Sequence, residues 1–292
     1  MKKILFTLIA LVTAFSAGAQ FPGWGPQSKV VTDSIHSDIL GATRQYTIYL
    51  PKSYDVDKDR TYPVLYLLHG MSGVNTSWFN DQRVMDVLDQ LIASGEACEM
   101  IVVSPNAGGN PSTEWNGYFN MPGWKYEDFF YQEFLPYIEK TYRIKADKGH
   151  RAIAGLSMGG GGATSYAQRH PDMFSSAYAM SALMNIPSGA ENPTPDPKSK
   201  MNLLTNAVIK NSCIKYIQDA DDARKNDLRT VAWFVDCGDD DFLLDRNIEF
   251  YQAMRNAGIP CQFRVRDGGH TGEYWHSALY TALPFVTRNF DK

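Results

Sequence analysis

Apolar runs alternate with helix-forming stretches along most of the 292-residue chain. Continuous apolar runs are typical of strands buried on both faces, and they lie at 63–70, 100–104, 150–155, 174–182 and 230–238. Amphipathic or helix-forming patterns predict helices between them, at 75–94, 127–142, 159–170, 201–223, 247–258 and 275–290. Alternating residues predict an antiparallel hairpin of strands at 29–34 and 43–50, and a last strand at 261–265. This order predicts a single α/β domain, with a doubly wound, mostly parallel sheet and helices on both faces.

The first residues have the pattern of a targeting segment. Two lysines precede an apolar core at 4–15, and Ala17, Gly18 and Ala19 form a small-residue cleavage signal. This core is too short to span a membrane comfortably, and no later segment is long and apolar enough to do so. We therefore expect a signal peptide at 1–19 and cleavage before Gln20. The domain of residues 20–292 would be exported to the periplasm or the medium, with no membrane span.

The composition is that of an ordinary globular protein, and it narrows the range of ligands. The net charge of −4 gives no basic footprint for nucleic acid, so neutral or weakly polar substrates are expected. Four cysteines, at positions 98, 213, 237 and 261, leave open whether they pair as disulfides or remain buried thiols. No Cys-x-x-Cys or histidine cluster has the spacing of metal ligands, and we expect neither a metal nor a cofactor.

The strongest candidate for chemistry is Gly155-Leu156-Ser157-Met158-Gly159, which lies between a predicted strand and a predicted helix. It fits the G-x-S-x-G pattern of a nucleophile elbow, in which a serine occupies a sharp strand-to-helix turn. Side chains two residues to either side would collide with neighbouring backbone, and glycine at both places removes that collision. We expect Ser157 to be a nucleophile and the Met158 N–H to donate to the oxyanion. The alternative is a tight glycine turn that holds an incidental serine.

The loop after the predicted strand 63–70 is the second candidate segment. Parallel sheets bind ligands beyond the carboxyl ends of their strands, where residues 69–73 would lie. In α/β-hydrolases this loop supplies the second oxyanion amide, and Met71 is our candidate for it. Because His69 precedes Ser157 in the chain, we expect His69 to shape the loop by hydrogen bonding rather than to act in catalysis.

Acids and a histidine also follow predicted strands. Asp239, Asp240 and Asp241 come first, and His270 lies later in a glycine-flanked loop. The order serine, acid, histidine is that of α/β-hydrolases, so His270 is the expected general base, with His276 in the last helix as a reserve. One carboxylate would orient the imidazole, and the pattern alone does not choose among the three. A calcium site is an alternative for the acidic run, although no spaced ligand loop accompanies it.

Two segments are candidates for contact with substrate. The loop at 111–124 holds Trp115, Tyr118 and Trp124, and aromatic side chains in a loop either pack beneath it or line a pocket. Both arrangements stay open, and we take these three as candidate substrate-binding residues. The second segment is an expected insertion at 184–221, which is either a lid or pocket wall, or a solvated decoration.

Five segments carry a family resemblance. They are 44–51, 62–70, 155–160, 237–241 and 268–270. In this order they resemble the esterase D / carbohydrate esterase family 1 group, and within it the feruloyl esterase domains associated with xylan breakdown. The resemblance extends from about residue 30 to residue 290, and its ordered motifs are more specific than the elbow alone. The segment 184–221 has no counterpart, which leaves the acyl and sugar preference open.

The resemblance implies an α/β-hydrolase fold, an esterase activity and a set of site residues. The residues are Ser157 as nucleophile, His270 as base, Asp241 as acid, Met71 and Met158 as oxyanion donors through their amides, and Trp78 and Trp275 at matching positions. Trp275 thereby joins the candidate substrate-binding residues.

The expected activity is hydrolysis of feruloyl or related hydroxycinnamoyl groups esterified to plant cell-wall polysaccharide such as xylan, through an acyl-enzyme. The alternatives are an acetyl xylan esterase and an acyltransferase of the same fold. Hydrolysis of S-formylglutathione is disfavoured, because that substrate is cytosolic and the chain carries an export pattern. An alternative of another class is a non-catalytic carbohydrate-binding protein that stacks sugars on the 115–124 aromatic residues.

Overall fold

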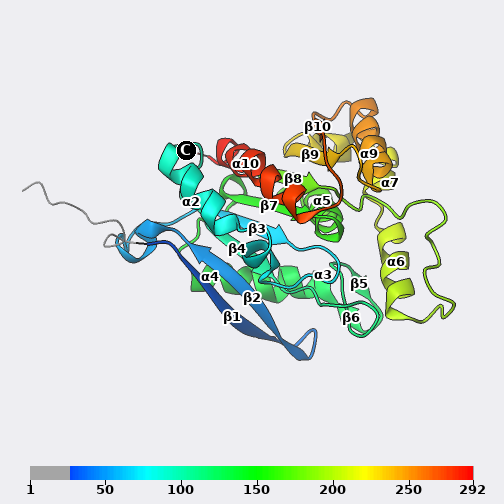
Figure 1. The fold of residues 1–292 in the computed structure, drawn as a ribbon, viewed down its shortest axis with the longest axis horizontal. Helices are drawn as coiled ribbons and strands as arrows, with labels where there is room; N and C mark the ends of the chain where they lie inside the picture. Colours follow the sequence, from blue (N-terminus) through cyan, green and yellow to red (C-terminus); the bar gives the residue numbers. More distant parts are fainter. Residues whose placement is uncertain (1–26, 292) are drawn as a thin grey trace, which may run out of the picture.

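A computed structural model describes residues 27–291, and its centre is one large sheet (Figure 1). Within these residues eight strands form the sheet, in the order β1-β2-β4-β3-β7-β8-β9-β10. Their bounds are β1 (Lys29–Ser37), β2 (Ala42–Leu50), β3 (Val64–Leu68), β4 (Ile101–Pro105), β7 (Arg151–Leu156), β8 (Ser176–Met180), β9 (Ala232–Gly238) and β10 (Gln262–Arg266). The β1–β2 and β2–β4 pairs are antiparallel, and the other neighbours are parallel. The predicted mostly parallel α/β sheet is confirmed.

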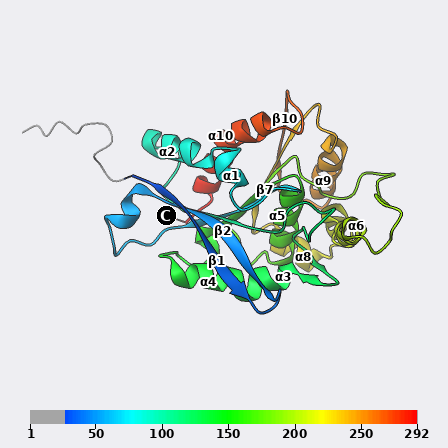
Figure 2. The ribbon, with the colours of Figure 1, turned by 60° about the horizontal axis from the view of Figure 1, so that its bottom comes forward.

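Helices cover both faces of this sheet (Figures 1 and 2). Their bounds are α1 (Ser77–Asn80), α2 (Val84–Ser94), α3 (Tyr126–Phe129), α4 (Leu135–Thr141), α5 (Met158–Arg169), α6 (Lys200–Lys210), α7 (Cys213–Gln218), α8 (Asp222–Leu228), α9 (Leu244–Asn256) and α10 (Gly272–Arg288), with the short turns η1 (Lys52–Asp55), η2 (Phe130–Phe134) and η3 (Lys148–His150). Apolar side chains of α2 and α10 pack into one core, and those of α4, α5 and α9 pack into the core on the opposite face.

Strand β3 illustrates why the central runs are apolar throughout. Leu65 and Leu67 belong to the core with α2 and α10, whereas Tyr66 and Leu68 belong to the core with α4 and α5. Successive side chains of a strand point to opposite faces, so a strand covered on both sides has no exposed position to fill with a polar residue. Parallel pairing of β3 with β7 brings their carboxyl ends to the same edge, where the loop after β3 meets the turn into α5.

Three predicted helices differ from the continuous form expected, and one of them, 201–223, divides into α6, α7 and the start of α8. The stretch 75–94 divides into α1 and α2, because Arg83 between them has a left-handed backbone (φ 53°) that a right-handed helix does not continue. Arg83 Nε then donates to Asp86 in the first turn of α2, at 2.8 Å. The stretch 127–142 remains helical, but the π-helical turn η2 lies between α3 and α4.

The 184–221 segment packs beside the aromatic loop. Helix α6 contacts the hairpin of β5 (Asn120–Met121) and β6 (Trp124–Lys125), and the two lie side by side in Figure 1. Lys200 Nζ donates to the Thr113 carbonyl at 2.9 Å. The division of the chain into a signal peptide, an esterase domain and an insertion stays a prediction, and residues 1–19 lie outside the described residues.

The cysteine question left open by the sequence has a definite answer in the structure. Cys98, Cys213, Cys237 and Cys261 are all free, and burial raises the pKa of each thiol. They therefore behave as small apolar side chains rather than as cross-links. Among the described helices, none has the length and apolar content needed to cross a membrane.

Candidate active site

Ser157 lies on the turn between β7 and α5 with strained backbone angles, φ 54° and ψ −120°. The flanking glycines make this turn possible: a Cβ at Gly155 would lie 2.2 Å from the Gly159 carbonyl oxygen, and a Cβ at Gly159 would lie 2.2 Å from the Leu68 carbonyl oxygen. Both distances are far inside van der Waals contact, so neither position accepts a side chain without a backbone shift. The Ser157 amide donates to the Met180 carbonyl at 2.9 Å, which fixes the turn to β8.

Three side chains from separate loops meet at this turn. His270 Nε2 is 2.9 Å from Ser157 Oγ, and His270 Nδ1 is 3.0 and 2.9 Å from the two carboxylate oxygens of Asp241. This is the geometry of a nucleophile, a base and an orienting acid. His276 lies elsewhere, on α10, and its Nδ1 contacts the Gln82 carbonyl at 2.8 Å.

The structure separates the three consecutive aspartates. Asp241 is buried, whereas Asp239 and Asp240 are exposed. Burial raises the pKa of the Asp241 carboxyl, but hydrogen bonds from His270, Ser181 and the Leu243 amide outweigh burial and hold this pKa below its usual 3.8. Asp241 is therefore ionised at neutral pH, as an acid that stabilises an imidazolium must be.

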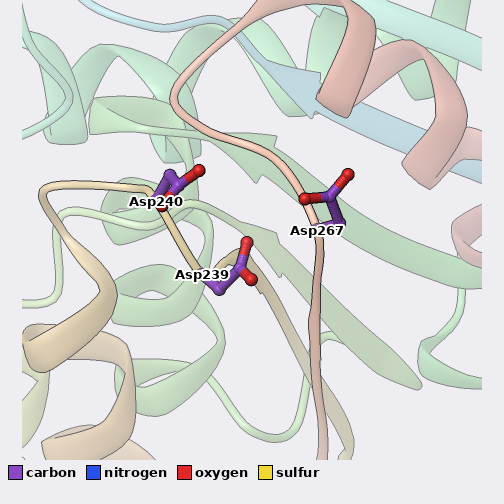
Figure 3. A group of neighbouring side chains, drawn as sticks. All are labelled: Asp239, Asp240 and Asp267. Carbon is purple, nitrogen blue, oxygen red and sulfur yellow. The ribbon is translucent and has the colours of Figure 1, made fainter.

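Asp239 and Asp240 point to solvent together with Asp267 from the neighbouring loop (Figure 3). One oxygen from each of the three carboxylates lies within 4.8 Å of the others. Asp239 also accepts the Gly268 amide at 3.0 Å, and the Asp240 amide donates to the Gly268 carbonyl at 3.0 Å. These bonds join the acid loop to the histidine loop. Exposed carboxylates alone do not define a cation site, and we assign none here.

Two backbone amides near Ser157 are the candidates for an oxyanion hole. Met158 is the first residue of α5 and follows Ser157, and Met71 lies in the loop after β3. Within residues 27–291 neither amide donates to another protein group. Both are therefore available to a ligand oxygen. Their role in an oxyanion hole stays a prediction.

His69 shapes the Met71 loop by hydrogen bonding, as expected. Its Nδ1 bonds to the Gly70 carbonyl at 2.8 Å, and its Nε2 accepts the Ala107 amide at 3.0 Å. Nε2 must carry a lone pair to accept, so His69 is neutral with its proton on Nδ1. Burial lowers the pKa of His69 from 6.5 to about 4, which keeps it neutral at neutral pH.

This lowered pKa predicts a loss of stability in acid. In the unfolded chain His69 takes up a proton as the pH falls below 6.5. In the folded chain His69 stays neutral down to about pH 4. The free energy of unfolding should therefore fall as pH drops through this window, by about 3 kcal/mol in all. Urea unfolding of the native chain and the His69→Gln variant at pH 7 and pH 4.5 measures it. At pH 7 the native chain should have a higher free energy of unfolding than the variant. Most of this difference should disappear at pH 4.5. Parallel pH profiles would contradict the assignment.

A cavity of about 490 Å³ opens beside Ser157 and His270. Its walls are mainly apolar, and its other lining residues include Met71, Ser72, Trp78, Gln82, Phe242 and Trp275. Trp275 therefore lies at the site, where its ring meets His270 edge-on at 4.9 Å and its Nε1 donates to Ser181 Oγ at 3.1 Å. A larger hollow of about 620 Å³ lies away from the triad, near Lys148 and Trp233, and none of the triad residues lines it.

The other candidate aromatic residues lie elsewhere. The structure places three of them, Trp115, Tyr118 and Trp124, outside the lining of the cavity beside Ser157. This placement corrects the expectation that they contact substrate there. Tyr118 and Trp124 are buried, and Trp115 stacks on Trp124. Tyr118 Oη donates to the His69 carbonyl at 2.9 Å, so these rings pack beneath the loop and support it. Described residues of the 184–221 segment do not line this cavity either.

A buried acid near the site was not predicted from the sequence. Asp236 in β9 is fully buried and accepts hydrogen bonds from Tyr178 at 2.7 Å, Tyr274 at 2.5 Å and Arg264. Tyr274 lies in the first turn of α10 and Arg264 in β10, on either side of the loop that carries His270. Asp236 thus ties both ends of the histidine loop to the strand that precedes Asp241. The only hint in the sequence was an acid inside an apolar strand. Its partner Arg264 becomes visible in the sheet, where the two residues are paired in register.

Comparisons with known proteins agree that this chain is similar to esterases. The family described as "Putative esterase" matches residues 37–286. A solved structure described as a ferulic acid esterase is 69% identical, with a TM-score of 0.89, over 91% of this chain and 99% of that one. The "Endo-1,4-beta-xylanase/feruloyl esterase" of Xylanibacter ruminicola is 32% identical over 83% of this chain, and "Endo-1,4-beta-xylanase Y" of Acetivibrio thermocellus is 33% identical over 46% of it. This chain spans only 29% and 12% of the lengths of those two xylanases.

Proposed function

This chain belongs to the esterase family and is a carboxylic ester hydrolase, and from that premise we propose that it releases feruloyl or related hydroxycinnamoyl groups from plant cell-wall polysaccharide such as xylan. The observation that carries the proposal is the 69% identity to a ferulic acid esterase over nearly its whole length. The match to a xylanase/feruloyl esterase supports the polysaccharide as the carrier of the ester.

The triad geometry supports a two-step mechanism. His270 Nε2 takes the proton of Ser157 Oγ as the oxygen attacks the ester carbonyl, and Asp241 stabilises the resulting imidazolium. The Met71 and Met158 amides hold the oxyanion of the tetrahedral intermediate. When this intermediate collapses, His270 gives its proton to the departing sugar oxygen and leaves an acyl-enzyme. Water, deprotonated by His270, then attacks the acyl-enzyme. When the second tetrahedral intermediate collapses, His270 gives this proton to the departing Ser157 Oγ, and the free acid is released.

The cavity supports an aromatic acyl group rather than an acetyl group. At about 490 Å³ it falls in the range of sites that enclose a small organic ligand, and an acetyl group would leave most of it unfilled. Trp275 offers aromatic surface, while Ser72 and Gln82 offer polar groups for the phenol and methoxy substituents of a feruloyl ring.

The test uses two esters that differ only in the acyl group, 4-nitrophenyl ferulate and 4-nitrophenyl acetate. The acetate is intrinsically more reactive, because its carbonyl is not conjugated, so a higher kcat/KM for the ferulate would report recognition of the acyl group. Turnover of the acetate alone would move the substrate to acetylated xylan. Feruloyl transfer to an added sugar would indicate an acyltransferase, and glycan binding without any hydrolysis would indicate a binding protein.

We also propose that the protein is exported, on the pattern of residues 1–19. Amino-terminal sequencing of the protein from a producing cell should begin at Gln20 and should find it outside the cytoplasm. An intact Met1 on cytoplasmic protein would overturn this proposal.

A further inference from the structure

Phe242 is exposed in a way that the triad does not explain. It exposes 70% of its surface, more than any other large apolar side chain in the described part of the chain. Its neighbours on both sides are buried, with Asp241 at 5% and Leu243 at 1% exposure. An apolar ring held in water forgoes the free energy of burial, so it is informative when it lies at a binding site.

The backbone presents this ring rigidly. Asp241 Oδ1 accepts the Leu243 amide at 2.9 Å, and the Asp241 carbonyl accepts the Leu244 amide at 2.9 Å. Leu243 caps the start of α9, with its side chain in the protein interior. Phe242 is thus fixed between an anchored acid and a helix start, and its exposure does not come from a loose loop.

The ring lies on one particular side of the reaction centre. Its centroid is 4.6 Å from that of the His270 imidazole, and Phe242 lines the cavity that contains Ser157. In ester cleavage His270 Nε2 must reach the oxygen of the departing alcohol, whereas the carbonyl oxygen turns toward the Met71 and Met158 amides. Phe242 touches the imidazole that protonates this oxygen and is largely exposed, so it lies at the open edge of the cavity that receives the acyl group, where the alcohol part of the ester would extend.

We propose that Phe242 is a stacking platform for the sugar ring that bears the ester, and so a specificity residue for the alcohol side of the substrate. The inference rests on the proposed esterase function. The apolar C–H face of a pentose or hexose ring matches a flat aromatic surface in size and polarity. An open platform also suits a sugar within a polysaccharide, because the chain must continue into solvent on both sides and cannot enter a closed slot.

The test compares two esters of the same acid, a feruloylated xylo-oligosaccharide and methyl ferulate. Phe242→Ala should lower kcat/KM for the oligosaccharide by roughly tenfold, the effect of losing one aromatic contact, and should lower it for methyl ferulate by less than about threefold. The loss on the oligosaccharide should appear as a higher KM. Phe242→Trp should restore most of the preference, because it restores the flat surface. Val56→Ala removes another exposed apolar side chain, which follows η1 and does not line the cavity, and should leave the ratio unchanged.

The outcomes separate this inference from the proposed function. Equal losses on both esters would mean that Phe242 only shields or positions His270, and no loss on either would mean that the ring contacts a partner other than the substrate. Both results overturn the platform. If the native chain hydrolyses acetyl but not feruloyl esters, the proposed acyl group is wrong, and an acetylated xylo-oligosaccharide against methyl acetate then makes the same comparison.

Discussion

Replacing Ser157 with alanine should lower kcat on aryl esters on the order of a million-fold, with binding of the ester retained. The effect is large because the chemistry passes through a covalent bond to Oγ, and no other hydroxyl within the described residues bonds to His270 Nε2. The oxyanion amides and the cavity stay in place, so the variant should keep a residual rate above that of water. Steady-state kinetics with 4-nitrophenyl ferulate, together with labelling by a fluorophosphonate reagent, measures the change.

The fold should tolerate this substitution. Among the described residues, the Ser157 hydroxyl bonds only to His270, and the bonds that hold the turn come from the Ser157 backbone. The melting temperature of Ser157→Ala should therefore stay close to that of the native chain. Ser112→Ala, on an exposed loop position, serves as the matched control and should be labelled and active as the native chain is. Full activity in Ser157→Ala would show that another residue is the nucleophile.

Much of the fold follows from local rules that the sequence displays. The run that becomes β3 is apolar at every position because both of its faces are covered, and the glycines at 155 and 159 are required because a Cβ at either would collide with backbone. The order of serine, acid and histidine depends on connectivity alone, which is why Ser157 and His270 were singled out before any geometry, whereas Asp241 was chosen among three aspartates only through the family resemblance. These features need no knowledge of distant contacts.

Other features depend on contacts between segments distant in the sequence. The aromatic loop had two possible arrangements, and the choice was made by partners such as the His69 carbonyl, which Tyr118 reaches across 49 positions of sequence. The apolar pattern did not show the break at Arg83, because helical periodicity continues across it. Asp236 was hidden in the same way, since an acid inside a strand is interpretable only once Arg264 and Tyr274 are placed against it.

Replacing Asp241 with asparagine should lower kcat by roughly ten-thousand-fold. An amide carries no negative charge to stabilise the imidazolium, and its NH₂ group can hold the imidazole in the tautomer whose Nε2 bears the proton and cannot accept one from Ser157. Asparagine Oδ1 can still accept the Leu243 amide, so the turn that carries the residue should persist. Kinetics on 4-nitrophenyl ferulate, with circular dichroism to monitor the fold, makes the measurement.

The neighbouring aspartates supply matched controls for this variant. Asp239→Asn keeps an oxygen that can accept the Gly268 amide, and Asp240 contributes its backbone rather than its carboxylate to the link with the histidine loop. Both variants should stay within about threefold of the native rate, because both carboxylates are exposed to water and neither bonds to His270. A loss at Asp239 or Asp240 equal to that at Asp241 would mean that the loop as a whole, rather than one buried carboxylate, orients the histidine and stabilises its protonated form during the reaction.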